Sequence, residues 1–253
     1  MEHLDLPAIA DVPQEIPLGG GIFHRRRIGD VLDPFREPQH VLDELKRAMG
    51  TMAFSAQYLQ RPIPAEGNLI KRDWLPYYDR LPERRATARV VVSWDTAMKA
   101  TELSDYSVGT AWLVDGSDCY LLDIIRDRFD FPDLRRAVLA QYHRYRPSSV
   151  LIEDKGSGTS LIQDLRYHRI PVIAIGAEHD KITRLYTVQP KFESRSVFLP
   201  RNAPWLPDLV AELLAFPNGR HDDQVDSISQ ALAWVERRRQ GPIAGMGRYV
   251  VRR

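Results

Sequence analysis

The sequence predicts an α/β protein in which helices flank a central mixed β-sheet, preceded by an irregular N-terminal extension. Three observations lead to this prediction. Three apolar or β-branched runs follow one another between residues 89 and 126, and short apolar runs then alternate with helical periodicity up to residue 216. In front of them, seven prolines between residues 7 and 64 keep interrupting any regular pattern.

The sheet is expected to begin with a meander of three neighbouring strands. Residues 89–94, 106–114 and 119–126 form these strands, separated by short turn-rich segments. A helix follows, because Asp130-Phe131-Pro132-Asp133 provides a helix start with proline in the first turn. Its apolar residues then recur at helical spacing: Leu134, Val138, Tyr142 and Tyr145.

The rest of the chain alternates between strands and helices. Strands are predicted at residues 149–153 and 171–175, and helices at 161–167 and 205–216. A turn at 217–219 precedes a last helix, whose apolar stripe contains Val225, Ile228, Leu232 and Val235. The predicted order is βββαβαβα and a final helix. In the N-terminal extension we expect only one or two helical turns, around residues 41–58.

The composition is that of a globular protein with one sizeable core and an appendage, or with two small domains. The chain has 253 residues, is 43% hydrophobic, and carries 35 Lys and Arg against 34 Asp and Glu, which excludes collagen-like and broadly disordered classes. Its longest apolar runs are far shorter than the ~20 residues that cross a bilayer, so no membrane partner is expected. Since Cys119 is the single cysteine and residues 1–5 do not resemble a signal peptide, we expect a cytoplasmic protein.

Acidic residues stand at the ends of elements that are predicted to pack in one sheet. Asp95 follows the first strand, and Glu153 ends the strand at 149–153. An ionised side chain at the end of an apolar run is costly unless it reaches water or a cation. On the last helix, Asp223 and Asp226 are three residues apart and lie on one face, whereas the adjacent Asp222 points elsewhere.

Gathered carboxylates predict a divalent cation, because they repel each other unless their pKa values rise or a cation neutralises them. Oxygen ligands without nearby cysteine or an evident histidine pair favour Mg²⁺ or Mn²⁺. Two such ions can activate water and stabilise the leaving oxygen in phosphodiester hydrolysis. Taken singly, Asp95 also fits a surface carboxylate at a strand end, and Asp222 a helix N-cap. Together, the order of these acids is the layout of ribonuclease H-like nucleases.

Six short motifs follow one another within residues 86–237. They are Ser93-Trp94-Asp95-Thr96-Ala97, Ser104-Asp105-Tyr106-Ser107-Val108-Gly109, Ile152-Glu153-Asp154-Lys155-Gly156-Ser157-Gly158, Asp180-Lys181-Ile182-Thr183-Arg184, Val197-Phe198-Leu199-Pro200 and His221-Asp222-Asp223-Gln224-Val225-Asp226. With these motifs the sequence resembles the C-terminal nuclease domain of tailed-phage or prophage terminase large subunits, the motors that package and cut viral DNA. Upstream, residues 6–10 and 54–62 look like the end of that family's ATPase domain and its linker.

The resemblance implies a ribonuclease H-like fold and a metal-dependent endonuclease that cuts concatemeric double-stranded DNA in the bacterial host during packaging. By matched position, Asp95 and Glu153 would be ligands of two Mg²⁺ or Mn²⁺ ions. The acidic cluster would supply a third ligand, and the family pattern leaves the choice among Asp222, Asp223 and Asp226 open. Helix geometry favours Asp223 with Asp226, so these two join Asp95 and Glu153 as predicted catalytic residues.

Basic residues close to these acids are candidates for contacts with DNA. Lys181 and Arg184 match a basic motif of the family, and ordinary exposed helix charges are the alternative. Lys155 follows Glu153 closely and is expected to hold a phosphate, to position water, or to be a solvated lysine. Asp105 also matches the family and is interpreted as a residue that supports the ligands or forms a turn. His221 is interpreted as a helix-start residue rather than a ligand.

The expected segments are residues 1–85, a linker or remnant of the ATPase domain, residues 86–240, the nuclease domain, and residues 241–253, a basic tail. The chain contains no Gly-Lys dipeptide and therefore no Walker A loop, so no ATPase activity is expected from it alone. The ATPase motor is missing from this sequence. Besides DNA, the resemblance implies a separate terminase ATPase chain, a terminase small subunit and a portal protein as partners.

Two other functions stay open at this point. A nuclease of the Holliday-junction resolvase or transposase type would share the fold, and a preference for branched DNA would distinguish it. Alternatively, a truncated terminase would serve only as a DNA-binding or portal-docking module, which a metal titration without binding would support. A sugar-kinase-like ATPase is excluded, because no glycine-rich turn follows the first strand.

Overall fold

The computed structural model describes residues 6–60, 69–97, 106–176, 181–219 and 221–240. They belong to two compact units. The smaller unit comprises residues 1–67 and 189–194, and the larger unit comprises the remainder of the chain. The larger unit thus begins at Asn68, and the predicted basic tail, 241–253, lies outside the described residues. The three segments expected from the sequence stay predictions as functional domains.

The smaller unit contains a β-hairpin and a long helix. Strands β1 (Gln14–Gly19) and β2 (Ile22–Arg26) pair antiparallel around Gly20 and Gly21, whose positive φ angles suit a tight hairpin turn. Helix α1 (Gln39–Gln57) has 19 residues and kinks at Gly50. The one or two turns predicted around residues 41–58 are therefore too few, because the kink interrupts the apolar periodicity by which a continuous helix is recognised.

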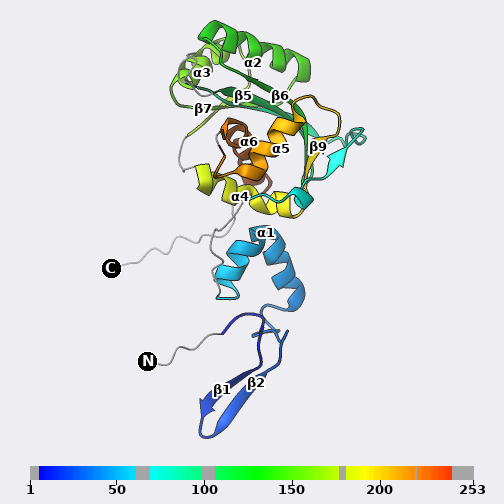
Figure 1. Cartoon of the computed structure of the whole chain (residues 1–253), viewed down its shortest axis with the longest axis vertical. Helices are drawn as coiled ribbons and strands as arrows, with labels where there is room; N and C mark the ends of the chain where they lie inside the picture. Colours follow the sequence, from blue (N-terminus) through cyan, green and yellow to red (C-terminus); the bar gives the residue numbers. More distant parts are fainter. Residues whose placement is uncertain (1–5, 61–68, 98–105, 177–180, 220, 241–253) are drawn as a thin grey trace, which may run out of the picture. The chain divides into compact units, whose positions relative to one another are not determined.

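The larger unit is built on a seven-stranded mixed sheet (Figure 1). Its strands, in the order in which they lie side by side, are β3 (Tyr77–Tyr78), β9 (Val197–Pro200), β6 (Asp118–Asp127), β5 (Ser107–Asp115), β4 (Arg89–Asp95), β7 (Ser149–Glu153) and β8 (Val172–Ile175). Strands β4, β5 and β6 form the predicted meander, and β7 and β8 continue parallel to β4. The predicted mixed sheet is confirmed.

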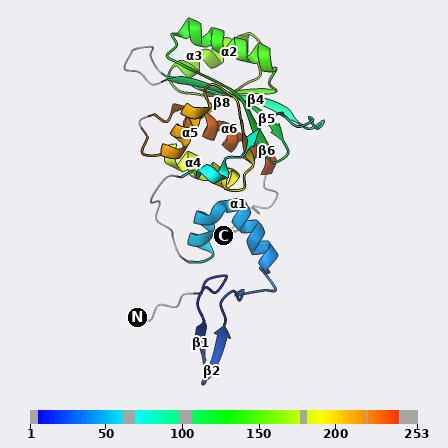
Figure 2. The ribbon, with the colours of Figure 1, turned by 45° about the vertical axis from the view of Figure 1, so that its right-hand side comes forward.

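Helices cover both faces of this sheet (Figures 1 and 2). One face is covered by α2 (Phe131–Tyr145) and α3 (Ser157–Tyr167), and the other by α5 (Leu206–Ala215) and α6 (Asp223–Gln240). Because both faces are covered, all nine residues of β5 are buried. The ring of Trp94 packs directly against Gly109 of β5. A Cβ at this position would lie 2.3 Å from the ring, which explains the glycine.

Several elements of the larger unit were not predicted from the sequence. Helix α4 (Lys181–Glu193) contains Pro190, which argues against a helix at that point, and β9 has only four residues and ends in a proline. The two-residue strand β3 and the 3₁₀ helix η1 (Arg72–Trp74) are too short to give a periodic pattern. None of the helices in the described ranges combines the length and the apolarity that a bilayer span requires.

Candidate functional site

Three of the predicted acidic residues meet where β4 and β7 end. The two strands are parallel neighbours with Trp94 opposite Ile152, so the next residue of each, Asp95 and Glu153, lies at the same sheet edge. Asp226 joins them from the start of α6, which packs on β4 and β5. The charges of Asp226 and Glu153 both act on the carboxyl group of Asp95. These three residues form what we call the acidic site.

Buried hydrogen bonds fasten α6 to the end of β4. The hydroxyl of Ser93 donates to the carbonyl oxygen of Ser227 at 3.0 Å, and the hydroxyl of Ser227 donates to the carbonyl oxygen of Ser93 at 2.9 Å. The side-chain amide of Gln230 donates to Ser93 Oγ at 2.9 Å and to the carbonyl oxygen of Trp94 at 3.2 Å. Since Ser227 and Trp94 adjoin Asp226 and Asp95, these bonds set the position of one carboxylate relative to the other.

The surroundings of the acidic site disfavour the ionised form of its carboxyl groups. Part of Asp95 reaches solvent, but burial of its carboxyl group, together with the charges of Asp226 and Glu153, raises its pKa to about 8. Burial also raises the pKa of Asp226, which is only 2% exposed. A site that holds a proton on a carboxyl group near neutral pH is one that a cation would stabilise.

Two basic side chains from α4 already pair with these carboxylates. Arg184 bridges Glu153 and Asp226, with its two terminal nitrogens 3.2 and 3.0 Å from their oxygens. Lys181 Nζ lies 2.8 Å from Asp226 Oδ2 and 2.7 Å from Asp222 Oδ1. Desolvation lowers the pKa of Lys181, but the hydrogen bonds to Asp222 and Asp226 outweigh it, and its pKa is raised.

The structure separates the acidic residues of α6 that the sequence grouped together. Asp226 lies in the acidic site. Asp222 lies beside that site and forms an ion pair with Lys181. Asp223 is 4% exposed, and its carboxylate pairs with Arg126 of β6 at 3.6 Å. Of the three, Asp226 is therefore the one whose charge acts on Asp95.

The turn after β7 brings α3 close to the acidic site. A Cβ on Gly158 would lie 2.1 Å from the carbonyl oxygen of Glu153, so only glycine allows this approach. Ser157 Oγ donates to the carbonyl oxygen of Ala97 at 2.7 Å and joins the turn to the end of β4. Lys155 is exposed in this turn, as a phosphate contact requires, whereas Asp105 lies outside the described residues.

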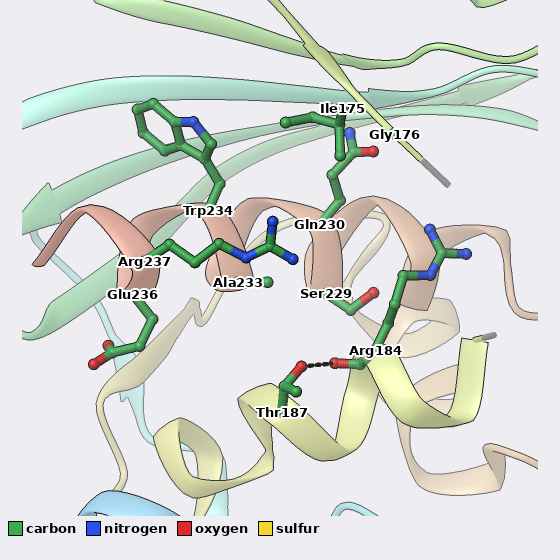
Figure 3. A pocket seen from close by; sticks show the side chains of 10 residues that line it. All are labelled: Ile175, Gly176, Arg184, Thr187, Ser229, Gln230, Ala233, Trp234, Glu236 and Arg237. Carbon is green, nitrogen blue, oxygen red and sulfur yellow. Dashed lines mark hydrogen bonds between the residues drawn. The ribbon is translucent and has the colours of Figure 1, made fainter. Parts of the chain in front are cut away.

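A pocket of about 390 Å³ lies beside the acidic site and is lined by Arg184, which pairs with Glu153 and Asp226 (Figure 3). It lies between β8, α4 and α6, and Thr187, Gln230 and Arg237 also line it. Trp234 completes one wall, but Arg89 and Arg238 lie over its ring, 5.9 and 4.8 Å from the ring centroid. The pocket therefore combines polar and charged side chains with a larger share of apolar surface, and the ring of Trp234 is partly covered by the two arginines.

The donor chemistry of the acidic site fits a hard divalent cation, since its three acids offer carboxylate oxygens. In the part of the chain that the structure describes, however, no three acidic, histidine or cysteine side chains come close enough together to enclose an ion as they stand. Instead, Arg184 pairs with Glu153 and Asp226, and Lys181 pairs with Asp226. An ion at these carboxylates would therefore compete with the two basic side chains.

Sequence reasoning missed the residues that hold the acidic site in place. Ser93, Ser227 and Gln230 lie among apolar residues of β4 and α6, and polar residues inside an apolar pattern are a usable signal, because buried polar groups need partners. It also missed the ring of Tyr106 just before β5, over which Arg126 and Arg128 lie. No local pattern reports that contact, because it joins two strands.

Comparison with known proteins points to the same region. The family model described as the terminase RNaseH-like domain matches residues 92–234. No curated protein sequence matches the chain. Among solved structures, the large terminase nuclease from the thermophilic phage G20c with bound magnesium has a TM-score of 0.50 at 19% identity, over 67% of this chain and 98% of that chain.

A longer protein shows the same likeness. The large terminase from another thermophilic bacteriophage has a TM-score of 0.59 at 14% identity, over 78% of this chain and 52% of that chain. The same large terminase in complex with ADP has a TM-score of 0.58 at 14% identity, over 82% and 52%. This chain thus spans about half the length of that large terminase. The likeness confirms the predicted ribonuclease H-like fold.

Proposed function

Since this chain belongs to the terminase RNaseH-like family, we propose that it is an endonuclease that cuts double-stranded DNA with the help of divalent cations. The observation that carries the proposal is the meeting of Asp95, Glu153 and Asp226 at one sheet edge. Mg²⁺ or Mn²⁺ suits these oxygen ligands. The G20c nuclease, which has the same fold, was solved with magnesium bound, which supports this choice.

In this proposal Asp95, Glu153 and Asp226 hold two cations. When bound, the cations supply an activated water and stabilise the leaving oxygen of the phosphodiester. Asp222, beside Asp226, is a further candidate ligand at the rim. Asp223, which the sequence also suggested as a ligand, instead holds Arg126 in place.

In the proposal, Lys181 and Arg184 of α4 pair first with carboxylates and then with phosphates of the DNA. Before a cation binds, Lys181 and Arg184 neutralise the carboxylates of the acidic site. With a cation at the acidic site, the two side chains would be available to the phosphates of the DNA, as would the exposed Lys155. The same positive charges thus stabilise the empty site and hold the substrate.

The family suggests a cellular setting. We propose that the chain cuts concatemeric phage DNA in the cytoplasm of the bacterial host. A terminase ATPase chain, a terminase small subunit and a portal protein are its proposed partners.

A plasmid assay tests the function. The purified chain is incubated with supercoiled plasmid and Mn²⁺ or Mg²⁺, beside a sample with EDTA and the variants Asp95→Asn and Glu153→Gln. As a matched control, Asp154→Asn removes a carboxylate at the neighbouring exposed position. We expect the parent and the control variant to nick or linearise the plasmid when the cation is present. Asp95→Asn, Glu153→Gln and the EDTA sample should leave it supercoiled. A folded Asp95→Asn variant that cuts at the parental rate would contradict the proposed site, and DNA binding without cation binding or cutting would favour the binding-module alternative.

A further inference from the structure

A second group of side chains stands at the same sheet edge as the acidic site, on the side of β6. The ring of Tyr106, just before β5, lies under two guanidinium groups: the Cζ atoms of Arg126 and Arg128 are 4.2 and 4.4 Å from the ring centroid. His221 packs against the same ring nearly at right angles, with ring centroids 5.7 Å apart. We call these four residues the tyrosine patch.

Strand register places the tyrosine patch relative to Asp95. Asp95 is paired with Val108 of β5, and Val108 is paired with Arg126 of β6. Directly paired residues of neighbouring strands point to the same face of a sheet, so Arg126 shares a face with Asp95. Two strand spacings separate these residues, which is about 10 Å. The ion pair of Arg126 with Asp223, three residues before Asp226, agrees with this placement.

Arg126 serves the patch as an anchor. Its guanidinium lies 3.6 Å from the carboxylates of both Glu212 of α5 and Asp223 of α6, so two ion pairs hold it beside Tyr106. Glu212 is itself held, because it accepts hydrogen bonds from the backbone and side chain of Gln224. The ring of Tyr106 therefore packs on a guanidinium that α5 and α6 hold by ion pairs.

Arg128 and His221 are the exposed members of the patch. Stacking on Tyr106 keeps the guanidinium of Arg128 in one orientation, so less side-chain entropy is lost when it binds a ligand. A planar guanidinium held in this way suits the two oxygens of a phosphate group. An anion is the ligand that this chemistry selects, and the nearest source of phosphates is the DNA at the acidic site.

We infer that Arg128, supported by Tyr106 and Arg126 and assisted by His221, binds a backbone phosphate of the DNA outside the cutting site. Successive phosphates of one DNA strand are about 3.4 Å apart along the helix axis, so the separation of about 10 Å between Arg126 and Asp95 corresponds to roughly three nucleotides. Lys155, Lys181 and Arg184 would hold the DNA at the acidic site itself, and Arg128 would fix its direction across β4, β5 and β6. This inference rests on the proposed function.

Salt-dependent DNA binding tests the inference. Fluorescence anisotropy of a short labelled duplex is measured with EDTA over a series of salt concentrations, for the parent chain, Arg128→Ala, Arg128→Lys and Tyr106→Ala. The matched control is Arg166→Ala, which removes an exposed arginine from α3 on the opposite face of the sheet. Plasmid nicking with Mn²⁺ is recorded for each chain.

We expect Arg128→Ala to weaken binding severalfold and to reduce the slope of log K against log salt by about 0.9, the value for one lost phosphate contact. Arg128→Lys should keep the slope but bind more weakly, because lysine does not stack in the same orientation. Tyr106→Ala should also bind more weakly, because Arg128 loses its support. Arg166→Ala should leave the slope at the parental value.

Two results would overturn the inference, and they differ in what they say about the function. If Arg128→Ala and Arg166→Ala bind with the same slope as a parent that binds and nicks DNA, the tyrosine patch is no phosphate contact and the proposed nuclease stands. If the parent chain neither binds nor nicks DNA under any of these conditions, the proposed function and the inference fail together.

Discussion

Replacing Asp95 with asparagine should stabilise the protein in the absence of a divalent cation. The carboxyl group of Asp95 is buried beside two other acids, and its pKa is raised from 3.8 to about 8. Asparagine has almost the same shape and no charge to desolvate. The substitution therefore removes an unfavourable interaction from the folded state and leaves the unfolded state nearly unchanged.

The size and the sign of the effect follow from proton linkage. Between pH 4 and pH 8 the folded chain keeps a proton on Asp95 that the unfolded chain has lost, so the contribution of Asp95 to stability falls as the pH rises. Each pH unit costs about 1.4 kcal/mol, so Asp95→Asn should be more stable than the parent by up to about 4 kcal/mol at pH 7. Near pH 4 the two chains should be almost equally stable.

Urea unfolding in EDTA between pH 4 and pH 8 measures this difference. Asp154→Asn, which keeps an oxygen to accept the hydrogen bond from Thr159, is the matched control and should change the free energy of unfolding by less than about 0.5 kcal/mol at pH 7. Saturating Mn²⁺ should reverse the order, since only the parent has all the ligands of the ion. If the difference in free energy of unfolding between Asp95→Asn and the parent does not grow with pH, the pKa of Asp95 is not raised in the folded chain and the reasoning is refuted.

Three further results are expected. Lys181→Ala should bind Mn²⁺ more tightly than the parent in calorimetry, because it removes a charge that competes for Asp226, and equal affinity would refute that competition. Mn²⁺ affinity of the parent should rise with pH by up to about tenfold per unit and level off near pH 8, because a protonated Asp95 must lose its proton to bind the ion. Ser227→Ala should lower the free energy of unfolding by about 1–3 kcal/mol in urea, since it leaves buried partners on β4 and β5 unsatisfied.

The sequence predicted the sheet and the two strand-end acids because both depend on local patterns. Asp95 and Glu153 each follow an apolar run, and parallel neighbours end at the same edge, so their meeting needed only the strand order. The unpredicted β9 and α4 have weak local signals: a four-residue strand, and a helix with an internal proline. Tertiary contacts rather than propensity define these two elements.

The choice among the acids of α6 needed tertiary structure. Spacing of three residues places Asp223 and Asp226 on one face of a helix. The two side chains nevertheless meet different strands, because Asp223 pairs with Arg126 of β6, whereas Asp226 acts on Asp95 of β4. Sequence spacing gives the face of the helix, not the strand that each residue meets.

Lys181 and Arg184 show a similar limit. The sequence marked them as basic residues for DNA, and it could not show that they also neutralise the acidic site. The contacts of Arg184 with Glu153 and Asp226 join α4 to residues 31 and 42 positions away. No local pattern connects such distant charges.

The most direct test of the account compares Asp226→Asn with Asp223→Asn. Both variants remove one buried carboxylate from the first turn of α6, so they share their charge change and helix position. Mn²⁺ binding is measured by calorimetry, and plasmid cutting is measured on the same samples. The account predicts that Asp226→Asn loses both, and that Asp223→Asn binds the ion and cuts DNA. Parental Mn²⁺ binding and cutting by a folded Asp226→Asn variant would contradict the account.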